Sequence, residues 1–512
     1  MRIGEIMQRI AIIDIGSNSA RLVITQMYKS GAYNMVYNQK ETLRLSQKIN
    51  TNGELTETAF TDTLECMNSF ASMCELFHAN KIIAVATAAI RNAPNGKALV
   101  LKVKEATGIT LEIISGKAEA YMSYLGVINT LDIKDAIIFD LGGGSTEIIL
   151  VQNRKMVNSI SLPIGCVNLT ATFSSKNKIT PATYTKMRKA IAAQLNLVPW
   201  IKATGLPLVG VGGTARTVGK VEQKRVKYFT SKIHNYQFAI QNFKNTFKQL
   251  LTTSVAERKQ LPGLSSERAD IIIAGAAIIK ALADFSKAKK MIISGCGLRE
   301  GMFLSYYAPK NKQPLITEDI LADSCANASK LYTPDSEHSR HVTNLALAMY
   351  DSWKPLHKLN DRWRQLLQTA ALLHDIGITI NYYSHARHSA YMIENAKLFG
   401  LTHKEQVLTA IIAGWHNGIS RSYLRNKQYK ELLTEVDLKR LGIAALLLAL
   451  AESLDYSQTN QISELSATIS KKTAVLNLTA AVIPTIELHQ LKQQLRWFNK
   501  AFGLPLVIKT HK

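Results

Sequence analysis

The sequence predicts an α/β protein in which strands alternate with helices to about residue 305, followed by a mainly helical part and a small α+β region. The first part is predicted by a repeat at 10–25 and 136–151: apolar strand, Asp–apolar–Gly turn with small hydroxyl residues, apolar strand. The helical part is predicted by apolar helical stretches beyond residue 315, which carry most of the histidines. A chain of 512 residues is long enough for about three domains.

The second copy of the repeat is the most informative stretch of the chain. Residues 140–147 read Asp-Leu-Gly-Gly-Gly-Ser-Thr-Glu and lie between the apolar runs 136–139 and 148–151, which predicts two strands joined by a tight hairpin. The three glycines leave backbone N–H groups free to close on an anion. Carboxylates at both ends, Asp140 and Glu147, are suited to hold Mg²⁺ or an attacking water. The alternative is an ordinary glycine-rich hairpin with two solvated acids.

The first copy has the same construction. An apolar strand at 10–13 leads into Asp14-Ile-Gly-Ser-Asn-Ser and then into a second strand at 22–25. Two related hairpins that face one another would form a cleft with a phosphate-binding loop on each wall.

The next segments supply two charged residues at the ends of strands. A helix is expected over 56–78 and strands over 81–86 and 111–114. Arg91 follows the first of these strands, where it is placed to clamp phosphate oxygens, although a surface arginine is the commoner case. Glu119 lies in the first turn of an apolar helix over 118–128, where the helix dipole favours an ionised carboxylate that can act as a general base. The alternative is a plain helix-terminal glutamate.

The remaining chain adds further glycine-rich turns and then histidines. A strand at 208–211 enters the turn 212–216, another strand at 291–294 enters the turn 295–297, and 306–314 resembles a linker. A histidine, a distant His-Asp pair and a later aspartate on helices can bind a divalent metal, although packing or surface histidines are commoner. The residues of this pattern are His338, His341, His374, Asp375, His385, His388, His416 and Asp455. Short strands at 467–469, 474–478 and 506–508 and a helix over 486–502 form the last region.

The composition favours an anionic partner. The net charge is +24 and the isoelectric point is near 9.7, values that attract nucleic acid, an anionic membrane surface or polyphosphate. General solubility is the alternative explanation. No nucleic-acid-binding motif accompanies the charge, so specific nucleic-acid binding is not expected. Five scattered cysteines without a Cys-x-x-Cys pair, no signal-peptide layout and no apolar run long enough to span a bilayer predict a cytoplasmic protein.

Eight short motifs occur in one order and resemble the Ppx/GppA family, the exopolyphosphatases and guanosine pentaphosphate phosphohydrolases. They are residues 14–19, 86–91, 114–120, 140–147, 161–165, 210–214, 267–270 and 297–301. The resemblance covers residues 9–305 strongly, and the helical part resembles the family's HD-like domain. It implies two ribonuclease-H-like lobes of the actin/hexokinase-like ATPase fold, with the active site between them. The expected domains are 9–129, 130–305, 315–460 and a small α+β region at 461–512.

The resemblance also implies roles for individual residues. Glu119 corresponds to the catalytic base, and Arg91, also expected to take part in catalysis, corresponds to a phosphate-binding position. The phosphate-binding positions are Ser17, Asn18, Gly143, Gly144 and Ser145, and the Mg²⁺ carboxylates are Asp140, Glu147 and Asp14. In the HD-like domain, His338, His374, Asp375 and Asp455 form the expected frame of a divalent-metal site.

The chain departs from the family pattern at three places. Ala88 stands where a serine is usual, Lys117 and Ala118 replace acidic residues before Glu119, and Asn168 replaces a common arginine. The first departure removes a hydroxyl contact, and the second makes the entrance less acidic. None of them changes the expected base or the glycine-rich loops.

The expected activity is Mg²⁺-dependent release of terminal orthophosphate from inorganic polyphosphate, with K⁺ as a further candidate cofactor. The alternatives are 5′-phosphohydrolysis of guanosine pentaphosphate (pppGpp) to ppGpp and a non-catalytic polyphosphate- or nucleotide-binding regulator. A homodimer is expected from the resemblance.

Overall fold

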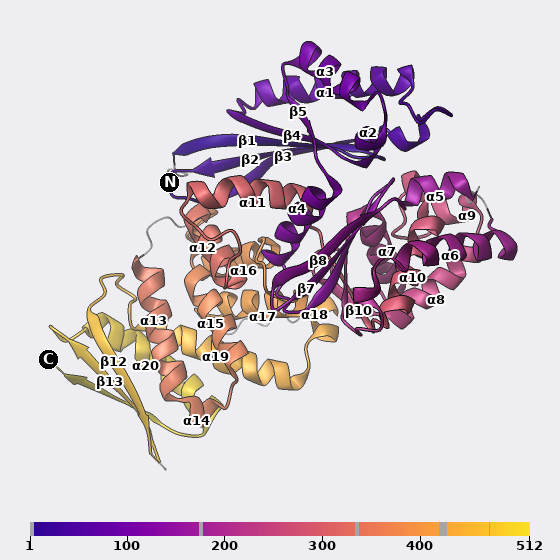
Figure 1. Cartoon of the computed structure of the whole chain (residues 1–512). Coiled ribbons are helices and arrows are strands. Elements are labelled where there is room, and N and C mark those ends of the chain that lie inside the picture. The colour runs from indigo at the N-terminus through magenta and orange to yellow at the C-terminus, as the bar shows by residue number, and fades with distance from the viewer. Residues whose placement is uncertain (1–4, 174–177, 333–336, 419–426, 471, 512) are drawn as a thin grey trace. The chain divides into compact units, whose positions relative to one another are not determined.

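The computed structural model describes residues 5–173, 178–332, 337–418, 427–470 and 472–511 (Figure 1). The chain forms two compact units. The α/β unit comprises Ile6–Lys29 and Tyr33–Ile320. The helical unit comprises the described residues from Leu321 onward, together with Glu5 and Ser30–Ala32. In the described residues no helix is long and apolar enough to cross a membrane.

Two sheets form the framework of the α/β unit. The first has the order β3-β2-β1-β4-β5, with antiparallel pairs between β1, β2 and β3 and parallel pairs between β1, β4 and β5. Its strands are β1 (Ile6–Ile15), β2 (Ala20–Tyr28), β3 (Tyr33–Glu41), β4 (Lys81–Ala86) and β5 (Leu111–Ile113). The sequence pattern missed β3, whose residues are mostly only partly buried.

The second sheet repeats this arrangement. Its order is β10-β11-β9-β6-β7-β8, so that β6, β7, β8, β9 and β11 correspond to β1 to β5 in order and direction. The strands are β6 (Ala136–Leu141), β7 (Thr146–Gln152), β8 (Lys155–Leu162), β9 (Leu208–Val211), β10 (Tyr236–Ala239) and β11 (Lys290–Ile293). The duplication expected from the two hairpins therefore extends through both sheets.

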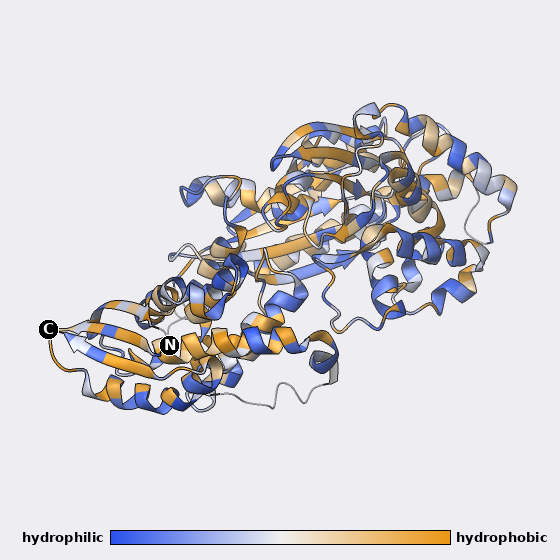
Figure 2. Ribbon diagram, turned by 90° about the horizontal axis from the view of Figure 1, so that it is seen from below, coloured by the Kyte–Doolittle hydropathy of each residue, from blue (hydrophilic) through white to orange (hydrophobic). Residues whose placement is uncertain are grey.

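The central strands are continuously apolar because both of their faces are covered. In β6, Ile137 and Phe139 enter the hydrophobic core on one face, and Ala136 and Ile138 enter a different core on the other. Figure 2 shows hydrophobic residues on the inner strands and many hydrophilic residues on the outer helices. One face of the first sheet is covered by α1 (Glu57–Leu76) and α3 (Gly96–Thr107), whose buried residues share its core. The second sheet is covered by α6 (Pro181–Leu195), α7 (Gly212–Arg225), α8 (Ile240–Thr252) and α10 (Ile272–Ser286).

Two helices cross between the halves of this unit. The helix α4 (Gly116–Ile128) follows the first sheet in the chain but packs on the second, whereas α11 (Leu298–Lys310) follows the second sheet and packs on the first. Where the helices contact each other, a Cβ on Gly126 would lie 2.1 Å from the Gly297 carbonyl oxygen. A Cβ on Gly301 would lie 1.9 Å from the Met122 carbonyl oxygen. Helices from each side of the expected domain boundary at residue 129 therefore pack on the sheet of the other side.

The expected linker at 306–314 is wrong in its first half, because residues 306–310 complete α11. Tyr307 is buried there, and its ring centroid lies 4.7 Å from that of Tyr33. Pro309 lies in the last turn of α11, where it donates no backbone hydrogen bond because proline has no N–H.

The helical unit contains α13 (Glu337–Ser352), α15 (Asp361–Leu373), α16 (His385–Asn395), α17 (His403–Gly414) and α19 (Glu435–Ser453) around an apolar interior. The shorter helices α14 (Lys354–His357) and α18 (Lys427–Leu432) and the first helix, α12 (Ile320–Tyr332), complete it. In the same unit, β12 (Ile462–Ile469), β13 (Ala474–Ala480) and β14 (Leu506–His511) form a small sheet beside α20 (Thr485–Phe502).

Candidate active site

A polar cavity in the α/β unit brings the two repeated hairpin loops together. Ser17 and Asn18 come from the turn after β1, and Gly142, Gly143 and Ser145 come from the turn after β6. Four carboxylates and four arginines complete its charged lining: Asp14, Glu119, Asp140, Glu300, Arg21, Arg216, Arg268 and Arg299. The sequence-based expectation that the hairpins face one another across a cleft is therefore confirmed.

The glycines of the second hairpin are required by close contact. A Cβ on Gly144 would lie 2.8 Å from the Ser17 hydroxyl, and a Cβ on Gly143 would lie 3.1 Å from the Ser17 Cβ. A Cβ on Gly165 would lie 2.3 Å from the Gly143 carbonyl oxygen, so Gly165 supports the loop from behind. Among the described residues, the amides of Gly143 and Gly144 donate to no protein acceptor. They are available to an anion.

Two aspartates lie at corresponding places, at the ends of β1 and β6. Burial raises the pKa of Asp14 to about 6; Arg299 opposes this shift and Asp140 adds to it. Burial also raises the pKa of Asp140, whose Oδ2 accepts a hydrogen bond from the Ser123 hydroxyl at 2.5 Å. Without a cation, the two buried carboxylates disfavour each other's ionisation.

Glu119 is placed by the start of α4, where the Ser115 side chain accepts a hydrogen bond from the Ala118 amide and caps the helix. Its Oε2 accepts a hydrogen bond from Arg91 Nη1 at 2.8 Å, and the same nitrogen donates to the Ile114 carbonyl at 3.0 Å. Burial raises the pKa of Glu119 well above its usual value, Glu147 raises it further, and Arg91 opposes the shift. The result is a nearly buried carboxylate beside one cation.

Arg91 and Glu147 are not among the residues that line the cavity. Arg91 bonds Glu119, so its expected role as a phosphate clamp stays a prediction. Glu147 is 1% exposed and accepts a hydrogen bond from the Ser161 hydroxyl at 2.7 Å. Burial raises the pKa of Glu147 to about 7, and Asp140 adds to this shift.

The expected set of Mg²⁺ carboxylates does not form a compact cluster of three. In the described part of the chain, groups of three ligand atoms within 4.8 Å of one another lie in the helical unit, and Asp14, Asp140 and Glu147 form no such group. Asp14 and Asp140 both line the cavity, which suits a cation held by two carboxylates and by substrate oxygens.

The four arginines of the cavity were not assigned a role from the sequence. Arg21 lies in β2 and Arg216 in α7, each shortly after a strand and a glycine- or serine-containing turn, and Arg299 follows the turn after β11. This repeated position after a turn was the sequence signal that could have identified these arginines as lining residues. Arg268 lies directly over Gly213, since a Cβ there would be 1.8 Å from its Nη2.

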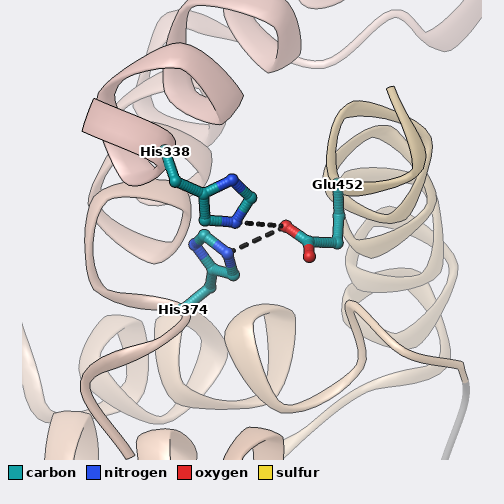
Figure 3. A group of neighbouring side chains, drawn as sticks. All are labelled: His338, His374 and Glu452. Carbon is teal, nitrogen blue, oxygen red and sulfur yellow. Dashed lines mark ion pairs between the residues drawn. The ribbon is translucent and has the colours of Figure 1, made fainter. Parts of the chain in front are cut away.

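In the helical unit the expected metal frame is rearranged. His338, His374 and Glu452 form one group of potential ligands (Figure 3), and Asp375, His385 and His416 form another. Asp455 belongs to neither group: its Oδ2 bonds His338 Nδ1 at 2.8 Å. Glu452 was missed because only its position one helical turn before Asp455 points to it.

Protonation of this cluster follows from its carboxylates and its burial. Burial lowers the pKa of His338, but hydrogen bonds to Asp455 and Glu452 outweigh this effect and raise it to about 10. Burial lowers the pKa of His416 to about 4, so this imidazole is neutral near pH 7.

Comparison with known proteins adds relatives for both units. Residues 13–309 match the Ppx/GppA phosphatase family, and residues 320–494 match Ppx/GppA phosphatase, domain III. A guanosine-5′-triphosphate,3′-diphosphate pyrophosphatase from Pseudoalteromonas translucida is 27% identical over 450 residues, which cover 85% of this chain and 86% of that protein. The protein of the same name from Aeromonas salmonicida is 27% identical over 406 residues, covering 78% and 79% of the two chains.

Solved structures resemble somewhat more than half of the chain. The Aquifex aeolicus PPX-GPPA enzyme is 31% identical with a TM-score of 0.51 and covers 58% of this chain and 99% of its own. An exopolyphosphatase from Cytophaga hutchinsonii is 24% identical with a TM-score of 0.55, covering 60% of this chain and all of that one, and shows the shared fold.

Proposed function

Because this chain belongs to the Ppx/GppA phosphatase family, hydrolases of phosphoanhydride bonds, we propose that it releases terminal orthophosphate from inorganic polyphosphate. The observation that carries this proposal is the cavity itself. Four arginines converge on two loops with available amides, beside the base Glu119. This arrangement suits a chain of linked phosphates more than a single one.

The lining of the cavity supports polyphosphate over a nucleotide. None of the described residues that line it is aromatic, so it offers no ring on which a guanine base could stack. The net charge of +24 supports a long polyanion, because many weak contacts along such a chain add up.

The carboxylates of the cavity fit Mg²⁺. Asp14 and Asp140 provide buried oxygen ligands whose ionised forms repel one another, and a divalent cation relieves that repulsion. Mg²⁺ often uses only one or two protein carboxylates and takes its other ligands from water and phosphate oxygens. When bound, it would neutralise negative charge on the phosphates.

The residues of the chain then have distinct tasks. The amides of Gly143 and Gly144, with the hydroxyls of Ser17 and Ser145, hold the terminal phosphoryl group, and Asn18 lies beside them. Glu119 orients a water for in-line attack and accepts its proton. The P–O bond to the leaving phosphate breaks as the P–O bond to the water oxygen forms. Arg91 opposes the rise in the pKa of Glu119 and so favours the ionised carboxylate.

A second candidate activity is 5′-phosphohydrolysis of pppGpp to ppGpp. It is favoured by the relatives that match most of the chain, which are named guanosine-5′-triphosphate,3′-diphosphate pyrophosphatases. The bond broken is of the same kind, so one site can serve both substrates.

Phosphate release from long-chain polyphosphate and from pppGpp, measured in parallel with Mg²⁺ at low and at physiological salt, tests the proposal. Release from polyphosphate that weakens as salt rises is expected. Glu119→Gln should abolish it, and Glu105→Gln, an exposed acid in α3, should not. Release from pppGpp alone would replace the proposed activity by 5′-phosphohydrolysis of pppGpp. Release from neither would overturn the enzymatic proposal in favour of a non-catalytic regulator.

We also propose a cytoplasmic location and a homodimer. The location is supported by the five cysteines, four of them buried, which form no disulfide in the described residues and suit a reducing compartment. The homodimer rests on the family resemblance, and K⁺ as a cofactor stays a prediction.

A further inference from the structure

The helical unit contains a second cluster of chemically active side chains. Four histidines and two carboxylates come together from α13, α16, α19, the end of α15 and the residues after α17. They are His338, His374, Asp375, His385, His416 and Glu452. Each side chain is buried or mostly buried; that of His385 is the most exposed, at 18%. This group has no part in the proposed polyphosphate hydrolysis, and the inference below does not depend on it.

Every histidine of the cluster is held by its Nδ1 atom. His338 Nδ1 lies 2.8 Å from Asp455 Oδ2, and His374 Nδ1 lies 2.7 Å from the Ala371 carbonyl oxygen. His385 Nδ1 lies 2.9 Å from the Tyr382 carbonyl oxygen. His416 Nδ1 lies 2.6 Å from the Ala413 carbonyl oxygen. Carboxylate and carbonyl oxygens can only accept, so each Nδ1 carries the hydrogen and a neutral ring presents a lone pair at Nε2.

These Nε2 atoms meet other electron-rich atoms. Nε2 of His338 and of His374 lie 3.1 and 2.9 Å from Glu452 Oε2 (Figure 3). Nε2 of His385 and of His416 lie 3.1 Å from each other. The first can also accept a hydrogen bond from the Asn417 side-chain amide at 3.2 Å. The His338 ring has a pKa of about 10, so a proton on its Nε2 can bridge the contact with Glu452. Where the rings are neutral in these tautomers, lone pairs face one another, and a cation between them relieves the repulsion.

Four buried polar atoms of the cluster contact one another or a neighbouring histidine as ion pairs but make no hydrogen bond of good geometry. These atoms are His338 Nε2, His374 Nε2, Asp375 Oδ1 and Glu452 Oε2. A buried polar group without a partner is destabilising by about 1–3 kcal/mol. Four such atoms directed at one small space are better explained by a missing ligand than by incomplete hydrogen bonding.

Asp375 lies between the two halves of the cluster. Its Oδ2 is 3.7 Å from His338 Nε2. Its Oδ1 is 3.6 Å from His374 Nε2, 3.4 Å from His385 Nε2 and 4.0 Å from His416 Nε2. The carboxylate of Asp375 therefore contacts histidines of both halves. A carboxylate placed in this way can bridge two metal ions about 3.5–4 Å apart.

We propose that the helical unit binds two divalent first-row transition-metal ions that share Asp375. The first ion is held by His338, His374 and Glu452, and the second by His385 and His416. The histidine-rich donor set suits Zn²⁺, Co²⁺, Ni²⁺ or Fe²⁺ better than Mg²⁺, which prefers oxygen ligands. Nitrogen and oxygen ligands at about 2.0–2.2 Å from one ion lie roughly 3 Å apart, close to the spacing around Glu452.

Asp455 is a positioning residue in this centre. It accepts the Nδ1–H of His338, fixes the tautomer and directs Nε2 inward, as outer-shell carboxylates do for metal-binding histidines. The sequence pattern had placed Asp455 among the ligands, and the geometry assigns that place to Glu452.

Cobalt titration of the metal-stripped full chain tests the proposal. The titration is followed by visible absorption, in excess Mg²⁺ to occupy oxygen-only sites, and metal content is measured on protein purified without a chelator. Two tightly bound Co²⁺ per chain are expected. Glu452→Gln and His416→Ala should each remove one of them, and His489→Ala, an exposed histidine in α20, should remove none.

Asp455→Ala should keep both ions but lower the affinity for the first by about 10–100-fold. Circular dichroism shows whether each variant is folded. Glu452→Gln keeps the shape of the side chain, so it tests the first site even if an alanine variant fails to fold. Absence of tight Co²⁺ binding by the wild type would overturn the proposal, as would spectra unchanged in folded Glu452→Gln and His416→Ala. Phosphate release from polyphosphate should be the same in these variants as in the wild type, which separates this proposal from the first.

Discussion

Replacing Glu119 by glutamine tests the centre of the proposed mechanism. The glutamine has the same shape, and its Oε1 can still accept the hydrogen bond that Arg91 Nη1 makes to Glu119 Oε2 at 2.8 Å. Arg91 also keeps its bond to the Ile114 carbonyl. The substitution therefore removes the negative charge and the basicity while the surrounding contacts remain.

The expected effect is on the chemical step. General base catalysis contributes about 10²–10⁴ in rate, which corresponds to roughly 2.7–5.4 kcal/mol of activation free energy at about 1.36 kcal/mol per tenfold change. The arginines that line the cavity are unchanged, so kcat should fall by this factor and KM should change little.

Steady-state release of phosphate from polyphosphate, together with an equilibrium filter-retention measurement of polyphosphate binding, separates these effects. Glu105→Gln is the matched control, because it changes the net charge equally at an exposed site. A kcat of Glu119→Gln within threefold of the wild type would refute the assignment of the base. A raised KM with unchanged kcat would show that Glu119 contributes only to binding.

Three further predictions concern Glu119 with Arg91, the Arg268 side chain, and the contact between α4 and α11. Burial, with Glu147, raises the pKa of Glu119 while Arg91 lowers it, so kcat/KM should rise with pH above the usual glutamate range. Arg91→Gln should shift this rise to higher pH; pH–rate profiles check it, and an unchanged or lower midpoint would contradict it. Gly213→Ala places a Cβ 1.8 Å from Arg268 Nη2 and should displace this guanidinium, raising KM for polyphosphate about tenfold or more; an unaltered KM would remove Arg268 from substrate binding. Gly126→Ala meets the Gly297 carbonyl oxygen at 2.1 Å and should lower the free energy of unfolding by about 1–3 kcal/mol in denaturant titrations. Its control, Gly442→Ala, has nothing within 4 Å in α19 and should be stabilising by up to about 1 kcal/mol.

Much of the α/β unit could be predicted because its signals are local. Continuous apolar runs mark strands such as β1 and β6, because a strand covered on both faces needs apolar residues at every position. The weaker runs of β3, β8 and β10 carry no such signal, since many of their residues are partly exposed. The similarity of the turns after β1 and β6 predicted that they would face one another, and both turns line the cavity.

The sequence by itself determined the two hairpins, the place of Glu119 at the start of α4 and the presence of histidines on helices. These features depend on residues within about one turn or one strand of each other. Tertiary structure alone decided that α4 and α11 exchange sheets, that four arginines from separate segments line one cavity, and that Arg91 pairs with Glu119. It also decided that Glu452 enters the histidine cluster while Asp455 supports it. Such contacts depend on the directions of side chains in segments that are distant in the chain. Glu452 and Asp455 lie about one helical turn apart, so local sequence does not show which of them enters the cluster.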